Sequence, residues 1–344
     1  MPRAGTRAAT LCGPEPWTFT MSLMHALAAD VGGTNARLAW VEVDRRGGSA
    51  PMVLSAQTYR CAEYPGLADV VRQFMTEHPG RPEALALACA GLRHGREIVN
   101  GNLPWRVHLD ALEAVAGEVP LVLSNDFEAL ARATRWLSTE AGTLLHAGKP
   151  SASAPVVVIG PGTGLGAALR VRLGDGERVL PTEAGRPGFA PVTPEESALL
   201  EWMRPLFGDD GHVDTEALLS GPGLFRIYRG LAHLQGRAAS AETPEEVSRG
   251  SESGDPLARS AVELFWGALA STCGNLVLAL GAYGGVLLAG GILPRLMHGF
   301  NANTFRARFT SKGVMRPVLE QVPVHLIEHG QLGIVGAAMA LSES

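Results

Sequence analysis

Cysteine is scarce in this sequence, and its spacing matches neither a metal site nor a disulfide framework. The four cysteines among 344 residues lie far apart, at positions 12, 61, 89 and 273, with no CxxC pair. Isolated thiols in a chain of this length are typical of a reducing compartment. The sequence therefore argues against a disulfide-stapled secreted domain and predicts a cytoplasmic protein.

Long apolar runs and long basic runs are also missing. No uninterrupted apolar stretch reaches the ~18–20 residues that a membrane span needs. Lys+Arg 29 against Asp+Glu 34 gives a formal charge of -5, and a mildly acidic chain without a basic run binds nucleic acid poorly. The N-terminus carries Arg3 and Arg7 but no apolar core of a secretory signal. We expect no membrane and no nucleic-acid partner.

What the sequence has in quantity is apolar residues and glycine. Hydrophobic residues make up 46% and charged residues 18% of the chain, which is enough for one or two cores and excludes a disordered protein. The 42 glycines concentrate in a few loops. Residues 1–22 show no periodicity, so we expect residues 1–24 to be a disordered extension or a mis-called start.

A strand, a glycine turn and a second strand occur twice, about half a chain apart. The first copy runs from the apolar residues 26–30 through a glycine turn to residues 37–43. The second runs from residues 156–159 through the glycines of 160–166 to residues 168–173. Helical periodicity follows each copy, with helices expected at 67–77, 109–116 and 256–280. The sequence therefore predicts an α/β fold with two related lobes around a cleft.

The glycine loops are suited to binding phosphate, because backbone N–H groups can approach it without interference from a β-carbon. An acidic residue before the first loop, Asp30, can hold Mg²⁺ directly or through water. The chain has no GxxxxGK(S/T) motif and is not a P-loop enzyme. The second loop also satisfies a loose dinucleotide fingerprint, with Glu183 as its acidic residue, but that fingerprint requires a helix where residues 168–173 alternate like a strand. A nicotinamide-dependent oxidoreductase is the less favoured alternative.

Three carboxylates could carry chemistry. Asp126 follows a short buried strand, where it could accept a proton from a substrate hydroxyl or merely cap a helix over 128–136. Glu183 and Glu216 lie in loops, where paired carboxylates can accept the hydroxyls of a sugar or remain solvated.

Read in order, the motifs of the chain resemble those of bacterial glucokinases, in the hexokinase/actin-like ATPase superfamily. They are DVGGTNARLA at 30–39, SNDF at 124–127, GPGTGLG at 160–166, LSGPGL at 219–224, GNL at 274–276 and GGVLLAGGILPR at 284–295. The resemblance runs from about residue 26 to the C-terminus. It implies two actin-like lobes, ATP-dependent phosphorylation of the glucose 6-hydroxyl and a homodimer. A small lobe would cover 25–135, completed by a helix over 330–344, and a large lobe would cover 136–329.

The same resemblance implies a set of site residues. Asp126 would be the base, and Asn125, Asp126, Glu183 and Glu216 would bind the sugar. Asp30 would place Mg²⁺ through water. The residues that would bind ATP are Asp30, Gly32, Gly33, Thr34, Asn35, Gly162, Thr163, Gly164, Gly290 and Gly291.

One position departs from the family pattern. The family usually reads Glu-Gly-Gly-His where this chain reads Glu183-Ala184-Gly185-Arg186, and that histidine contacts glucose hydroxyls. Arginine donates hydrogen bonds but accepts none. Arg186 could point into solvent or make a new contact with the substrate. A weaker glucose site, another hexose, an anionic sugar or a sugar sensor with little turnover therefore stay open.

Overall fold

The computed structural model describes residues 23–101, 103–137, 142–174, 176–328 and 330–343. The expected extension over 1–22 lies outside these residues. The first strand, β1 (Leu23–Val31), already includes Leu23 and Met24, which pair with the end of β2 (Asn35–Asp44). Met24 is buried. The expected boundary after residue 24 is therefore two residues too late.

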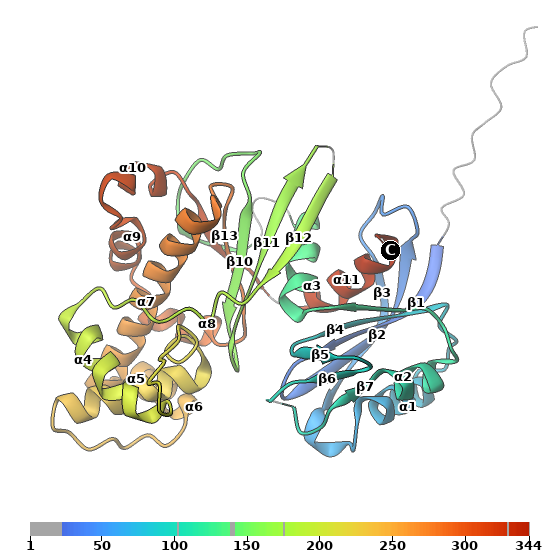
Figure 1. Cartoon of the computed structure of the whole chain (residues 1–344), viewed down its shortest axis with the longest axis horizontal. Coiled ribbons are helices and arrows are strands. Elements are labelled where there is room, and N and C mark those ends of the chain that lie inside the picture. The colour runs from blue at the N-terminus through green and yellow to red at the C-terminus, as the bar shows by residue number, and fades with distance from the viewer. Residues whose placement is uncertain (1–22, 102, 138–141, 175, 329, 344) are drawn as a thin grey trace, which may run out of the picture.

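Two sheets repeat one arrangement of strands (Figure 1), in which antiparallel strands at one side are followed by parallel ones. The first sheet has the order β3-β2-β1-β4-β8, with β3 (Met52–Arg60), β4 (Ala84–Cys89) and β8 (Leu121–Ser124). The second has the order β12-β11-β10-β13-β14-β9, with β9 (Thr143–His146), β10 (Val156–Pro161), β11 (Leu165–Leu173), β12 (Gly176–Thr182), β13 (Gly285–Leu288) and β14 (Val324–Leu326). The predicted repeat is confirmed.

The strands reach further into the second glycine segment than predicted. Gly160 pairs with Gly166 and Pro161 with Leu165, so only residues 162–164 form the turn. The sequence also did not predict the small sheet of β5 (Leu92–His94), β6 (Glu97–Val99) and β7 (Val107–His108). These strands are too short for a period of two to stand out.

Three helices have the predicted bounds: α1 (Leu67–Glu77), α2 (Leu109–Ala116) and α7 (Pro256–Leu280). By length and composition α7 could cross a membrane, but 78% of its apolar window is buried inside the protein, as in a core helix. The other helices are α3 (Asp126–Ala133), α4 (Pro194–Met203), α5 (Gly221–Leu234), α6 (Pro244–Ser253), α8 (Leu293–Leu296), α9 (Ala302–Thr310), α10 (Arg316–Leu319) and α11 (Leu332–Met339).

Helices α3 and α11 lie between the two sheets (Figure 1). Their backbones touch, because a β-carbon on Gly336 would lie 1.6 Å from the Ala129 carbonyl oxygen. On one side, Ala129 packs with Ile334 and with alanines of β1 and β4. On the other side, Leu130 and Ala131 pack against residues of β10 and β11. α3 therefore contacts both sheets, and the C-terminal helix returns to the first one. The lobe boundaries at 135/136 and 329/330 stay predictions.

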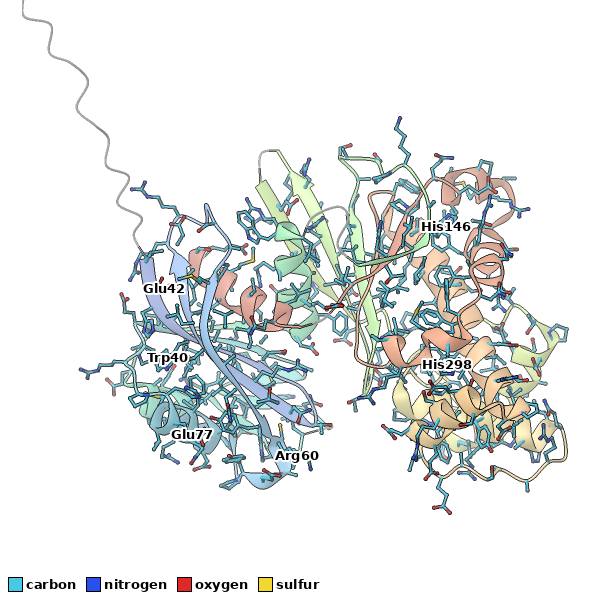
Figure 2. All side chains as sticks on the ribbon, turned by 180° about the vertical axis from the view of Figure 1, so that it is seen from behind. Trp40, Glu42, Arg60, Glu77, His146 and His298 are labelled. Atoms are coloured by element: carbon cyan, nitrogen blue, oxygen red, sulfur yellow. The ribbon has the colours of Figure 1, made fainter. Side chains whose placement is uncertain are left out.

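Each sheet has its own apolar core on the side away from these two helices. Trp40 belongs to the core of the first sheet (Figure 2), where its indole N–H donates to the His78 carbonyl at 2.8 Å. The two sheets thus have separate apolar cores, and α3 packs between them.

Candidate functional site

The first glycine hairpin joins β1 to β2. The Gly32 N–H donates to the Asn35 carbonyl at 3.0 Å and closes the turn, while Thr34 and Asn35 are exposed. Asp30, one residue before the end of β1, is buried. Its Oδ2 lies 3.3 Å from Arg37 Nη1. The hairpin thus places the Asp30 carboxylate and a glycine turn at one end of the sheet, where both line the cleft.

The second hairpin joins β10 to β11 and is held from two sides. The Gly162 N–H donates to the Gly164 carbonyl at 2.7 Å, and the Gly221 N–H at the start of α5 donates to the Gly162 carbonyl at 2.8 Å. Gly290, with φ +103°, approaches so closely that a β-carbon would lie 2.3 Å from the Pro161 carbonyl oxygen. Only glycine combines this φ with that approach. A strand follows the loop, so the helix that the dinucleotide fingerprint requires is missing and that interpretation is wrong.

Asp126 is the first residue of α3, and Asn125 is the residue that caps the helix. The Asn125 side chain accepts the N–H groups of Phe127 and Glu128, and the Glu128 carboxylate accepts the Asn125 N–H, which completes a capping box. The helix begins two residues earlier than the predicted 128. Asp126 is therefore not needed as the cap. The Asn125 oxygen is occupied by the helix, which leaves its amide N–H groups as the donors toward the cleft.

The carboxyl group of Asp126 holds its proton more tightly than an ordinary aspartate. Burial raises the pKa of Asp126 to about 6, the Phe127 N–H bond at 2.9 Å opposes this, and the negative charges of Asp30 and Glu183 add to it. A carboxyl group with a pKa near 6 is ionised at neutral pH and is a better proton acceptor than a solvated aspartate.

Two loops tied by backbone bonds carry the remaining predicted carboxylates. The Glu216 N–H donates to the Gly185 carbonyl at 2.9 Å, and the N–H and hydroxyl of Thr215 both donate to the Pro187 carbonyl, at 2.9 and 3.0 Å. Glu183 opens the first of these loops and is exposed. The two glutamates therefore lie on two loops that these hydrogen bonds hold together beside β12, and we call this pair of loops the platform.

Glu216 connects this platform to the second hairpin. Its Oε2 accepts the Leu165 N–H at 2.8 Å, and a β-carbon on Gly164 would lie 2.5 Å from the same oxygen. Its Oε1 lies 3.2 Å from Arg186 Nη1. The Arg186 side chain is 61% exposed, yet its ion pair with Glu216 holds it at the edge of the cleft. Partial burial lowers the pKa of Arg186, but the charges of Glu216 and Asp214 outweigh this and raise it.

All of these elements line one cleft of about 910 Å³. It holds every residue that the sequence singled out, namely Asp30, Gly32, Gly33, Thr34, Asn35, Asn125, Asp126, Gly162, Thr163, Gly164, Glu183, Arg186, Glu216, Gly290 and Gly291. Their individual roles stay predictions. The sequence did not single out Arg37 and Phe127, which also line the cleft. Arg37 lies inside the motif at 30–39 and Phe127 inside the motif at 124–127. Membership of these motifs was the signal that could have identified them as cleft residues.

The cleft suits a magnesium nucleotide better than a metal held by protein alone. Within the described residues, no group of three or more His, Cys, Asp or Glu side chains could hold a metal ion. Mg²⁺ commonly keeps several waters and uses one or two carboxylates together with substrate phosphates. The single carboxylate of Asp30 beside two glycine hairpins fits that arrangement.

Comparisons with known proteins agree on one family. The family model described as Glucokinase matches residues 27–344. A glucokinase-like protein of Xylella fastidiosa is 39% identical over 94% of this chain and 97% of its own. A glucokinase of Paramagnetospirillum magneticum is 38% identical over 91% and 96% of the two chains. The crystal structure of glucokinase from an Antarctic psychrotroph superposes with a TM-score of 0.79, at 31% identity, over 93% of this chain and 99% of that one. The predicted two-lobed fold is confirmed.

Proposed function

The chain belongs to the glucokinase family, and from this premise we propose that it transfers the γ-phosphoryl group of ATP to the 6-hydroxyl of glucose, with Asp126 as the general base. One observation carries the proposal. A carboxyl group with a pKa of about 6 stands in the cleft that two glycine hairpins and two loop glutamates border. Phosphoryl transfer needs little more than a base that aligns the hydroxyl and an electrostatic cradle for the phosphates.

In this proposal Asp126 accepts the proton of the sugar hydroxyl as the hydroxyl oxygen bonds to the γ-phosphorus, while the bond from that phosphorus to the bridging oxygen breaks and ADP leaves. The Phe127 N–H holds one oxygen of the carboxylate at 2.9 Å and orients the group. Because α3 contacts both sheets, the position of Asp126 is fixed relative to the bound sugar and to the two glycine hairpins. Such positioning of a general base contributes about 10²–10⁴-fold to the rate.

The sugar would lie between Asn125 and the platform of Glu183 and Glu216. Carboxylates accept hydroxyl hydrogens in charge-assisted bonds, and the Asn125 amide donates to hydroxyl oxygens. This combination of acceptors and donors suits a polyol, whose hydroxyls do both.

The nucleotide would lie along the two glycine hairpins, with its phosphates against their turns and with Gly290 and Gly291 beside the adenosine. Asp30 would hold Mg²⁺ through water. When bound, the ion neutralises phosphate charge. Among the described residues the cleft contributes only two cationic side chains, Arg37 and Arg186. Both pair with carboxylates, so the protein itself leaves most of that charge to the ion.

ADP release from ATP-Mg²⁺, measured with glucose, mannose, fructose, glucosamine and N-acetylglucosamine, tests the proposal. Asp126→Asn is the control, because it keeps an oxygen for the Phe127 N–H but cannot act as a base. We expect turnover on glucose and a loss of at least ~10²-fold in the variant, with glucose binding retained.

Turnover by Asp126→Asn near the wild-type rate would show that the base is misassigned. If glucose closes the cleft but no ADP is released, the second candidate, a sugar sensor, would be favoured. The replacement of the family histidine by Arg186 is the reason for considering it. A homodimer in the cytoplasm is proposed on family grounds, and light scattering of the purified protein tests the dimer.

A further inference from the structure

The charges around the sugar side of the cleft are predominantly negative. Glu183 and Glu216 line the cleft together with Arg186, and Asp214 lies directly behind them. The whole chain has only two lysines, Lys149 and Lys312, and neither lines the cleft. An anionic sugar entering here would therefore meet the carboxylates of Asp126, Glu183 and Glu216 in the cleft, a further carboxylate behind them and one guanidinium.

The guanidinium of Arg186 is already engaged with those carboxylates. Its Nη1 lies 3.1 Å from Asp214 Oδ2 and 3.2 Å from Glu216 Oε1. One nitrogen thus bridges two carboxylates that would otherwise repel each other at close range. An anionic ligand at Arg186 would therefore lie beside Asp214 and Glu216, whose negative charges oppose it.

Asp214 holds the same assembly from the other side. Its Oδ1 accepts the Ala217 N–H at 2.8 Å and closes the turn that carries Glu216, while its Oδ2 binds Arg186. A ring nitrogen of His212 lies 3.0 Å from the Arg186 carbonyl oxygen. The backbone and the side chain of Arg186 are therefore both fastened to the segment that carries Glu216.

We propose that Arg186 is a positioning residue for Glu216, and that the sugar side of the cleft selects an uncharged hexose and not an anionic one. The proposal rests on the proposed function in placing the sugar against Glu216. Arg186 holds one oxygen of that carboxylate and the Leu165 N–H holds the other. The carboxylate is thus oriented before the sugar binds, so binding does not include the entropy cost of ordering this side chain.

Glucose binding by calorimetry, together with KM and kcat from ADP release, tests the proposal in Arg186→Gln. We expect the glucose Kd and KM to rise about tenfold, the size of one lost charge-assisted bond, with kcat changed less than about threefold. Arg186→Lys keeps the charge and should recover much of the loss. The matched control is Arg72→Gln, whose side chain is 59% exposed and pairs with Asp69 on α1, outside the cleft. We expect this control to bind glucose as the wild type does.

A double-mutant cycle shows whether Arg186 acts through Glu216. In a Glu216→Gln background, the effect of Arg186→Gln should fall to within about twofold, because coupled residues are not additive. Full additivity of the two substitutions would overturn the positioning role. A glucose Kd within twofold of wild type in Arg186→Gln alone would overturn it as well.

Gluconate and glucose 1-phosphate, as competing ligands, test the charge selectivity. We expect both anions to bind the wild type more weakly than glucose. Tighter binding of either anion that disappears in Arg186→Gln would show that Arg186 is an anion receptor. Calorimetry separates this inference from the proposed function: a protein that binds glucose through Arg186 and Glu216 but releases no ADP would contradict only the kinase activity.

Discussion

The ring of Phe127 lies so close to Gly166 that a β-carbon on Gly166 would be 1.9 Å from a ring carbon. Gly160, paired with Gly166 across the hairpin, leaves room for the tip of the same ring. Phe127 directly follows Asp126 in α3, so this contact joins the helix that carries the proposed base to the hairpin proposed to hold phosphate. The absence of two side chains on β10 and β11 is what allows the two elements to meet.

Replacing Gly166 with alanine should therefore lower both stability and turnover. Overpacking of this kind typically costs about 1–3 kcal/mol in the free energy of unfolding, and a displaced α3 would move Asp126 away from the sugar hydroxyl. Urea unfolding and kcat measure the two effects. Phe127→Leu in the Gly166→Ala background should recover part of both, because the smaller side chain vacates the space. A Gly166→Ala variant with wild-type stability and kcat would contradict the contact.

The raised pKa of Asp126 predicts the pH dependence of the reaction. The base must be ionised to accept a proton, so kcat/KM should increase with pH and reach half of its maximum near pH 6, the pKa of Asp126 in the free protein. Initial rates at subsaturating glucose between pH 5 and 8 would measure this. A kcat/KM that stays constant from pH 5 to pH 8, as for an ordinary aspartate with a pKa of about 4, would show that burial does not control the pKa of this group.

The same group should make the wild type less stable than Asp126→Asn at neutral pH. The folded-state pKa of about 6 lies above the reference value of 3.8, so the folded protein binds the proton more tightly and loses stability as pH rises between these values. Asp126→Asn removes the ionisation. We expect its advantage in unfolding free energy to be small below pH 4 and to level off above pH 6 at about 1–3 kcal/mol. Urea titrations at pH 4 and 8 measure it, and an advantage that grows toward acid pH would refute the assignment.

Glu216 should affect nucleotide binding as well as sugar binding. Glu216→Gln retains an oxygen for the Leu165 N–H, whereas Glu216→Ala removes the acceptor from the hairpin turn. We expect both variants to raise the KM for glucose. Only Glu216→Ala should also raise the KM for ATP, by about tenfold. Equal ATP KM values in the two variants would mean that the hairpin holds its shape without this bond.

A buried ion pair outside the cleft should be important for stability. Glu196 is fully buried, and its Oε1 lies 2.6 Å from Arg308 Nη2. Arg308→Met leaves the carboxylate without its cation, and breaking a buried pair costs about 3–5 kcal/mol. The control is Arg204→Gln, an exposed pair with Glu201 at 3.1 Å, for which a change of no more than about 1 kcal/mol is expected. Urea unfolding compares the two, and equal effects would contradict the role of burial.

The elements that could be predicted are those whose signals are local in the chain. The glycine turns and the helices α1, α2 and α7 each lie within one stretch of sequence. Periodicity and turn chemistry therefore locate them. Errors occurred where two local signals competed, as at Asn125 and Asp126, since either residue can cap a helix. The structure decides for Asn125 because only its side chain accepts from both Phe127 and Glu128.

Other features of the site depend on residues that are distant in the chain. The bond between Glu216 and the Leu165 N–H spans 51 positions, and the one between Arg186 and Asp214 spans 28. No pattern in one segment shows which distant carboxylate an arginine will meet, because that depends on how the loops pack. From the sequence one could therefore derive the two lobes and the glycine hairpins, since these follow from local propensity, whereas the set of site residues followed from the resemblance of the motifs to those of glucokinases. Only the tertiary structure decided that Arg186 faces Glu216, that Phe127 fills the space at Gly166 and that Asp126 is buried enough to raise its pKa, because each of these depends on contacts between segments.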